Sequence, residues 1–264
     1  MSVVTNAKRI VVKVGTSTLT YENGKVNIRA IDALCRVLCD LQNAGHEMIL
    51  VSSGAIGVGV GKLGLPARPT ATSEKQACAA VGQCELMFLY DKLCGEYHQT
   101  VAQVLLTYDV TTEETKRKNV INTFGSLIRM GVIPVVNEND TVATDELEGE
   151  HFGDNDTLSA IVAGLADADL LVLLTDIDGL YTADPKSNPD ATKIDRLSRV
   201  GDAEFLLAGG AGSARGTGGM RTKLVAAKHA MDCGIPTVIM AGDKPERLYA
   251  LLEGESIGTL IGEE

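Results

Sequence analysis

Two lysines stand at positions where a cation is unfavourable unless an anion compensates it. Lys13 interrupts the apolar run 10–14, which otherwise has the composition of a buried central strand. Lys223 ends the glycine-rich segment 216–223 (Gly-Thr-Gly-Gly-Met-Arg-Thr-Lys) and falls in the first turn of a predicted helix, where the helix dipole disfavours a positive charge. Such a segment leaves backbone N–H groups open to an anion. A solvated surface lysine is the alternative for Lys223 alone, but the two lysines together indicate one phosphate-handling site.

A pair of carboxylates opens another predicted helix. Residues 153–156 read Gly-Asp-Asn-Asp, and a capping role accounts for at least one of the two aspartates. In the functional interpretation, one carboxylate orients the lysines and the neighbouring amide binds a substrate. Phosphoryl transfer asks for little covalent chemistry from the protein, but it needs positioned cations that neutralise the developing charge. The lysines, the carboxylate and the glycine-rich N–H groups would supply this.

The elements that must position these residues follow an alternating pattern of strands and helices. Such alternation predicts an α/β fold, a three-layer αβα sandwich with a central, mostly parallel sheet and helices on both faces. The predicted strands are 9–14, 47–52, 100–106, 132–137, 169–175 and 236–240, and the predicted helices are 27–44, 73–94, 111–130, 155–166, 219–233 and 245–252.

Polar, turn-competent loops follow most of the predicted strands. Ligands of such sheets bind beyond the carboxyl ends of the strands. Helix capping could account for the polar residues of any one of these loops, but it does not account for the whole set of loops together with two lysines. Segments 141–153 and 176–190 are predicted to form hairpins or lids over this edge. Residues 59–64 match Gly-x-Gly-x-x-Gly, but they come after the strand-to-helix turn, and we interpret them as a helix end with loop glycines. The loops are 15–18, 52–57, 137–140, 153–156 and 175–179.

Bulk composition limits the classes of function. The chain has 264 residues and a formal net charge of −11, which argues against a main role in binding nucleic acid or anionic membranes. Its six cysteines form no Cys-x-x-Cys pair, and we interpret them as small core residues in a reducing compartment. With no signal-peptide pattern and no apolar run of membrane-spanning length, the expected location is cytoplasmic.

Seven segments together resemble the glutamate-phosphorylating members of the amino-acid kinase superfamily, over residues 8–261. The resemblance implies ATP-dependent phosphorylation of the γ-carboxylate of L-glutamate to L-glutamyl 5-phosphate, the first step of proline biosynthesis. Many members of the family carry an additional C-terminal PUA domain, but here we expect one amino-acid kinase domain over residues 1–264, without a PUA domain. The segments are 13–17 (Lys-Val-Gly-Thr-Ser), 52–56 (Ser-Ser-Gly-Ala-Ile), 136–140 (Val-Asn-Glu-Asn-Asp), 153–156, 173–176 (Leu-Leu-Thr-Asp), 179–185 (Gly-Leu-Tyr-Thr-Ala-Asp-Pro) and 216–223.

The same resemblance implies roles for individual residues. Lys13 and Lys223 would contact the transferring phosphoryl group, and Asp156 would hold both lysines. Glutamate would be bound by Ser53, Asp140 and Asn155. Magnesium would be bridged mainly by the ATP phosphates, with no side-chain metal ligand. The nucleotide would be bound by Lys13, Thr175, Asp176, Thr217, Gly218, Gly219, Met220, Arg221, Thr222 and Lys223.

The remaining expectations concern binding partners and two alternative functions. The resemblance implies a homo-oligomer (dimer or tetramer), feedback inhibition by L-proline and a hand-off of product to glutamyl phosphate reductase. One alternative is a related kinase of the acetylglutamate or carbamate type, acting on another acid. The other is a non-catalytic, ligand-binding regulator on the same fold, against which the presence of both lysines and Asp156 argues.

Overall fold

The computed structural model describes residues 2–21, 24–143, 155–185, 187–207 and 219–263. Its centre is an eight-stranded sheet in the order β3-β4-β2-β1-β5-β9-β10-β8. The first six of these strands are parallel to one another, β10 is antiparallel to β9, and β8 is parallel to β10. The strands are β1 (Arg9–Val14), β2 (Glu47–Ser52), β3 (Val101–Leu106), β4 (Ile133–Glu138), β5 (Leu170–Thr175), β8 (Arg196–Leu197), β9 (Thr237–Ala241) and β10 (Thr259–Ile261).

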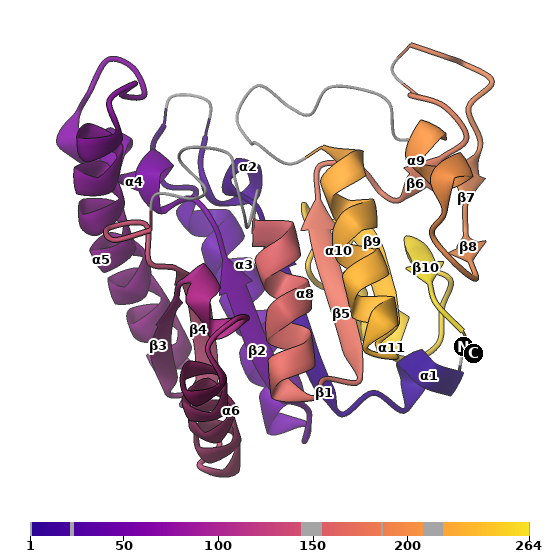
Figure 1. The fold of residues 1–264 in the computed structure, drawn as a ribbon, viewed down its shortest axis with the longest axis horizontal. Helices are drawn as coiled ribbons and strands as arrows, with labels where there is room; N and C mark the ends of the chain where they lie inside the picture. Colours follow the sequence, from indigo (N-terminus) through magenta and orange to yellow (C-terminus); the bar gives the residue numbers. More distant parts are fainter. Residues whose placement is uncertain (1, 22–23, 144–154, 186, 208–218, 264) are drawn as a thin grey trace.

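Helices cover both faces of the sheet and form the outer layers of the sandwich (Figure 1). Helices α3, α4, α5 and α11 pack on the face that carries Val12 and Leu50, whereas α6, α8 and α10 pack on the face that carries Val11 and Ile49. The helices are α1 (Ser2–Thr5), α2 (Thr16–Leu19), α3 (Ile28–Asn43), α4 (Ala55–Leu63), α5 (Thr72–Glu96), α6 (Glu114–Arg129), α8 (Asn155–Ala166), α9 (Asp202–Leu207), α10 (Met220–Asp232) and α11 (Arg247–Leu252), with one 3-10 turn, η1 (Tyr108–Val110).

The predicted sandwich and its six main strands are confirmed, each strand to within one residue at either end. Strands β8 and β10 were not predicted, because two or three residues are too few to show an alternating pattern. Of the two predicted lid segments, 176–190 contributes β6 (Leu180–Tyr181), which pairs antiparallel with β7 (Lys193–Ile194). Most of segment 141–153 lies outside the described residues.

Two smaller interpretations need correction. Gly59 and Gly61 lie inside α4, and only Gly64 is a loop glycine, at the C-cap of that helix. Cys84 and Cys233 are exposed, so four of the six cysteines are core residues and these two are not. In the part of the chain that the structure describes, no helix combines the length and the apolar character needed to cross a membrane.

Helices α4 and α5 form an antiparallel pair that approaches more closely than side chains would permit. A Cβ atom at Gly82 would lie 1.8 Å from the carbonyl oxygen of Ala55, and one at Gly59 would lie 1.9 Å from that of Cys78. Only glycine fits at such contacts. Because α4 follows directly from the carboxyl end of β2, this contact fixes the turn at residues 52–54.

We therefore predict that Gly82→Ala lowers the free energy of unfolding by at least about 2 kcal/mol, since the added methyl group meets backbone that cannot move away independently. Gly95→Ala is the matched control in the same helix, because a Cβ atom there meets nothing within 4 Å. Its stability should be unchanged or raised by up to about 1 kcal/mol. Urea unfolding of both variants measures this, and equal effects would contradict the packing argument.

Candidate active site

Lys13 is the one charged member of an otherwise apolar row that crosses the sheet. The strand register pairs Lys13 with Val51 on one side and Leu173 on the other, and the row continues to Val136 and Ile239. These apolar partners all face the layer formed by α6, α8 and α10. Because side chains alternate along a strand, Lys13 points toward the same helices.

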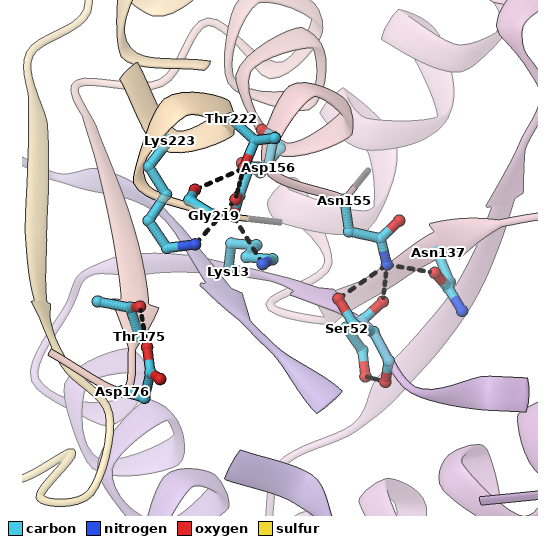
Figure 2. Close-up of polar contacts among 12 residues, drawn as sticks. Lys13, Ser52, Asn137, Asn155, Asp156, Thr175, Asp176, Gly219, Thr222 and Lys223 are labelled. Carbon is cyan, nitrogen blue, oxygen red and sulfur yellow. Dashed lines mark hydrogen bonds and ion pairs between the residues drawn. The ribbon is translucent and has the colours of Figure 1, made fainter. Parts of the chain in front are cut away.

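Asp156 forms ion pairs with Lys13 of β1 and with Lys223 of the neighbouring helix α10. Its carboxylate lies in the first turn of α8, with Oδ1 2.6 Å from the Lys13 Nζ and Oδ2 3.1 Å from the Lys223 Nζ. The Thr222 hydroxyl lies 2.9 Å from the same Oδ2 and 2.8 Å from the Gly219 carbonyl oxygen. Figure 2 shows the two ammonium groups converging beneath this carboxylate. Three elements distant in sequence therefore meet at one charged cluster.

The three charged side chains of this cluster are almost completely buried, so water does not solvate their charges. Asp156 is 0 % exposed, and Lys13 and Lys223 are 6 % and 5 % exposed. Burial by itself raises the pKa of Asp156, but the charges and hydrogen bonds of Lys13 and Lys223 outweigh it and hold that pKa well below its usual range. With both lysines protonated, the cluster carries one positive charge in excess. A buried excess charge is unfavourable, so the cluster is suited to receive an anion.

A second polar cluster lies on the other side of β1, at the ends of β2 and β4. The Asn155 Nδ2 lies 2.8 Å from the Ser52 carbonyl oxygen, 3.0 Å from the Ser53 Oγ and 2.9 Å from the Asn137 Oδ1. The Asn155 Oδ1 is buried and has no hydrogen-bond partner among the described residues. The structure thus brings together two of the three predicted glutamate-binding residues, Ser53 and Asn155. Asp140, the third, is half-buried in the turn that follows β4.

Of the predicted nucleotide residues outside the charged cluster, those that the structure describes lie on the opposite side of β1 from the Asn155 cluster. Thr175 ends β5, and its hydroxyl lies 3.1 Å from the Asp176 Oδ1. Gly219 caps α10 in extended conformation, and Met220 packs on the core beside it. Arg221 is exposed and covers the Phe205 ring, with its Cζ 5.6 Å from the ring centroid. The remaining two, Thr217 and Gly218, lie outside the described residues.

The order of the strands places the Asn155 cluster, the lysine pair and the end of β5 one after another along the carboxyl edge of the sheet. Neighbouring strands in the order β4-β2-β1-β5 carry Asn137, Ser53, Lys13 and Thr175 at or just beyond their carboxyl ends. The lysine pair therefore lies between the Asn155 cluster and the end of β5, as Figure 2 also shows. Such an arrangement can hold an acceptor on one side and a donor on the other, with the cations at the point of transfer.

One residue of the Asn155 cluster was not found by sequence reasoning. Gln83, on α5, accepts a hydrogen bond from the Asn137 Nδ2 to its Oε1 at 2.8 Å. The available signal was its position in the buried stripe of α5, where a glutamine stands between Ala79 and Leu86. The pairing with Asn137 crosses 54 positions, so no local pattern could reveal it.

Comparison with known proteins bears on the family and the fold of the chain. Residues 8–241 match the model of the amino acid kinase family. The chain is 55% identical over 257 residues to a protein named glutamate 5-kinase from Clostridium perfringens, covering 97% of this chain and 96% of the relative. It is 54% identical to one of the same name from Listeria monocytogenes, covering 97% and 93%. A solved isopentenyl phosphate kinase from T. acidophilum superposes with a TM-score of 0.64 at 20% identity, covering 96% of this chain and 99% of that one, which shows the shared fold.

The depressed pKa of Asp156 makes a prediction about stability and pH. Because the folded-state pKa is lowered, the ionised carboxylate stabilises the folded state above the ordinary value of about 3.9, and this contribution is lost as the pH falls toward the lower folded-state pKa. Asp156→Asn leaves two buried ammonium groups without their carboxylate. It should lower the free energy of unfolding at pH 7 by roughly 3–5 kcal/mol.

Chemical denaturation of wild type and Asp156→Asn between pH 7 and pH 3 measures this difference. The gap should stay constant above about pH 5 and narrow below about pH 4. Asp232→Asn, on the exposed end of α10, is the matched control and should shift stability by no more than about 0.5 kcal/mol. A gap that widens on acidification would contradict the assignment of Asp156 as an ionised, ion-paired group.

Proposed function

The chain belongs to the amino acid kinase family, and we propose that it transfers the γ-phosphoryl group of ATP to the γ-carboxylate of L-glutamate. The product would be L-glutamyl 5-phosphate, and the reaction would be the first step of proline biosynthesis. Relatives named glutamate 5-kinase, more than 50% identical over nearly the whole chain, support this substrate. The single observation that carries the chemistry is the buried cluster of Lys13, Asp156 and Lys223.

The excess positive charge of this cluster fits a phosphoryl group in transfer. Charge builds on the equatorial oxygens of that group during phosphoryl transfer, and fixed ammonium groups stabilise it without reorganisation of solvent. Without a carboxylate between them, Lys13 and Lys223 would repel each other and turn apart. Asp156 holds both side chains aimed at one point. We assign Lys13 and Lys223 as catalytic residues that touch the phosphoryl group, and Asp156 as the group that positions them.

The order of groups along the sheet edge supports an in-line transfer. The nucleotide would bind from the side of Thr175 and Asp176, with the segment 217–223 along its phosphates. Glutamate would bind from the side of Ser53, Asp140 and Asn155, with its γ-carboxylate toward the lysines. Donor and acceptor then approach from opposite sides of Lys13. This positioning supplies much of the rate enhancement that such a reaction requires.

ATP is the implied phosphoryl donor, and the cluster's excess positive charge fits its anionic phosphates. Magnesium, when bound, would neutralise charge on the phosphates. We propose that the ATP phosphates supply most of its ligands. Lys13 and Lys223 then act on the transferring group directly.

Regulation and assembly follow from the same proposal. L-proline shares an α-ammonium and an α-carboxylate with glutamate, so it would compete for overlapping contacts near Asp140 and Asn155. The acyl phosphate product is reactive toward water, which favours a hand-off to glutamyl phosphate reductase. We also propose a homo-oligomer, and one amino acid kinase domain over residues 1–264 remains a prediction.

Substrate choice tests the proposed function first. A free α-ammonium group needs hydrogen-bond acceptors, and the buried Asn155 Oδ1 supplies one. Acetylation removes the charge and two of the donors, so the turnover of L-glutamate should exceed that of N-acetylglutamate by at least roughly 10³ in kcat/KM. Steady-state release of ADP with Mg-ATP and a panel of L-glutamate, N-acetylglutamate, aspartate, carbamate and UMP measures this. Comparable turnover of N-acetylglutamate would refute the assignment.

Coupling between Asp156 and Lys223 tests the mechanism. Lys223→Ala should lower kcat by roughly 10²–10³, the scale for removing one preorganised charge stabiliser. Asp156→Asn should also lower kcat severely, although it is nearly isosteric and transfers no proton. Because the residues act as a unit, the double variant should be far less impaired than the product of the two single losses. Fully multiplicative losses would instead make Asp156 a helix cap without a role through the lysine.

A further inference from the structure

Gln83 is a buried polar residue that the proposed mechanism does not use. It lies on α5 at 9 % exposure, in a stripe whose other members include Ala79, Leu86 and Tyr90. A glutamine side chain is unfavourable in such surroundings unless its polar atoms are bonded. Its Oε1 accepts a hydrogen bond from the Asn137 Nδ2 at 2.8 Å. The glutamine thus belongs to the Asn155 cluster at the sheet edge, although its helix α5 and the helix α8 of Asn155 cover opposite faces of the sheet.

Three amides form a directional chain from α5 to α8. The Asn137 Nδ2 donates to Gln83, while the Asn137 Oδ1 accepts from the Asn155 Nδ2 at 2.9 Å. An amide group has a donor end and an acceptor end, so each bond in the chain fixes the orientation of the next amide. If one amide turned over, it would present a like group to each of its partners in the chain.

The direction of the chain is fixed at its α8 end by a carbonyl group. The Asn155 Nδ2 also donates to the Ser52 carbonyl oxygen at 2.8 Å, and a backbone carbonyl can only accept. The Asn155 nitrogen must therefore face Ser52, and Asn137 must present its oxygen to it. The Asn137 nitrogen then faces α5, where only an acceptor satisfies it. Gln83 supplies that acceptor.

The consequence is an acceptor atom that faces away from the chain. Figure 2 shows Asn155 with its nitrogen toward Ser52 and Asn137 and its oxygen on the far side. That Oδ1 is buried and has no partner among the described residues. Buried acceptors in native structures are nearly always satisfied, so this atom points to a ligand that brings a donor.

We propose that Gln83 is a positioning residue that holds the Asn137 and Asn155 amides in this direction and thereby gives the site its selectivity for a substrate with a free α-ammonium group. The inference rests on the proposed function, because the donor it assigns to the Asn155 Oδ1 is the ammonium of L-glutamate. Without the Gln83 acceptor, the Asn137 Nδ2 loses its partner on α5, and the Asn137 amide is held at one end only. The Asn155 amide then keeps its bond to Ser52 but loses a fixed partner in Asn137, so the Asn155 Oδ1 is held less firmly toward the substrate.

The test compares two variants of Gln83 with different hydrogen-bonding capacity. Gln83→Met keeps the length of the side chain but removes the acceptor, whereas Gln83→Glu keeps an acceptor for the Asn137 Nδ2. Gln83→Met should raise the KM for L-glutamate roughly tenfold, the scale of one net hydrogen bond, with kcat changed less than threefold and the KM for ATP unchanged. Gln83→Glu should remain within about threefold of wild type in all three constants.

Glutarate separates a lost acceptor from a damaged pocket. It has both terminal carboxylates but no ammonium group, so its inhibition constant against L-glutamate reports the rest of the site. In Gln83→Met the ratio of the glutarate Ki to the glutamate KM should fall about tenfold, because only glutamate loses a contact. Gln76→Met, elsewhere on α5 and only half-buried, is the matched control and should leave the ratio unchanged.

Each outcome bears on a different claim. An unchanged ratio in Gln83→Met, or an equal weakening of glutamate and glutarate, overturns the positioning role. A Gln83→Glu variant as impaired toward glutamate as Gln83→Met also overturns it, and this comparison stands even where one variant is less stable in thermal unfolding. If the wild-type protein itself fails to phosphorylate L-glutamate, the proposed function is what fails.

Discussion

The interaction on which the site depends is the burial of one carboxylate between two ammonium groups. Asp156, fully buried, satisfies Lys13 and Lys223 at once, yet leaves one positive charge in excess. Taking charges out of water is costly, so such a cluster persists only where it serves a purpose. Its three members come from β1, α8 and α10, and the packing of α8 against α10 over the sheet brings them together. The fold is thus arranged around an incomplete charge balance that an anionic group completes.

Along the edge of the sheet, further polar groups lie on both sides of the two lysines. On one side, the amides of Asn137 and Asn155 are fixed by a backbone carbonyl and by Gln83. On the other side, the end of β5 and the start of α10 offer hydroxyl and backbone groups. The close contact between α4 and α5 at Gly82 holds the turn after β2 in place. The described residues of the acceptor side therefore lie on helices and strands, except Ser53 in this turn and Asp140.

Much of this could be predicted from the sequence, because the strands and helices have clear periodicity. Lys13 was visible as a charge in an apolar run, and the strand register explains why it points toward α8. The phosphate-handling role of the two lysines was inferred from their unfavourable positions, but their shared partner was chosen only through the resemblance. Sequence spacing alone could not separate Asp154 from Asp156, since both stand where a cap would stand. In the structure, Asp156 is identified by its contacts to Lys13 and Lys223, which lie 143 and 67 positions away from it in the chain.

Other features could not be predicted, since they arise from contacts between distant elements. The link from Gln83 to Asn137 joins a helix on one face to a strand end, and no periodicity encodes it. The contact of Arg221 with the Phe205 ring of α9 likewise has no local sequence signal. Strands β8 and β10 are too short for a pattern and exist through pairing, β10 with β9 and β8 with β10. In each case the determining partner lies far away in the chain.

The most direct measurement is the structure of the protein with Mg-ADP, aluminium fluoride and L-glutamate, which together imitate the transfer of the phosphoryl group. The account predicts that the Nζ atoms of Lys13 and Lys223 both lie within about 3 Å of the fluoride ligands, with Asp156 still between them. It also predicts the nucleotide on the β5 side and glutamate on the β2 side. A fluoride group bound away from these lysines, or one lysine turned from it, would contradict the central claim.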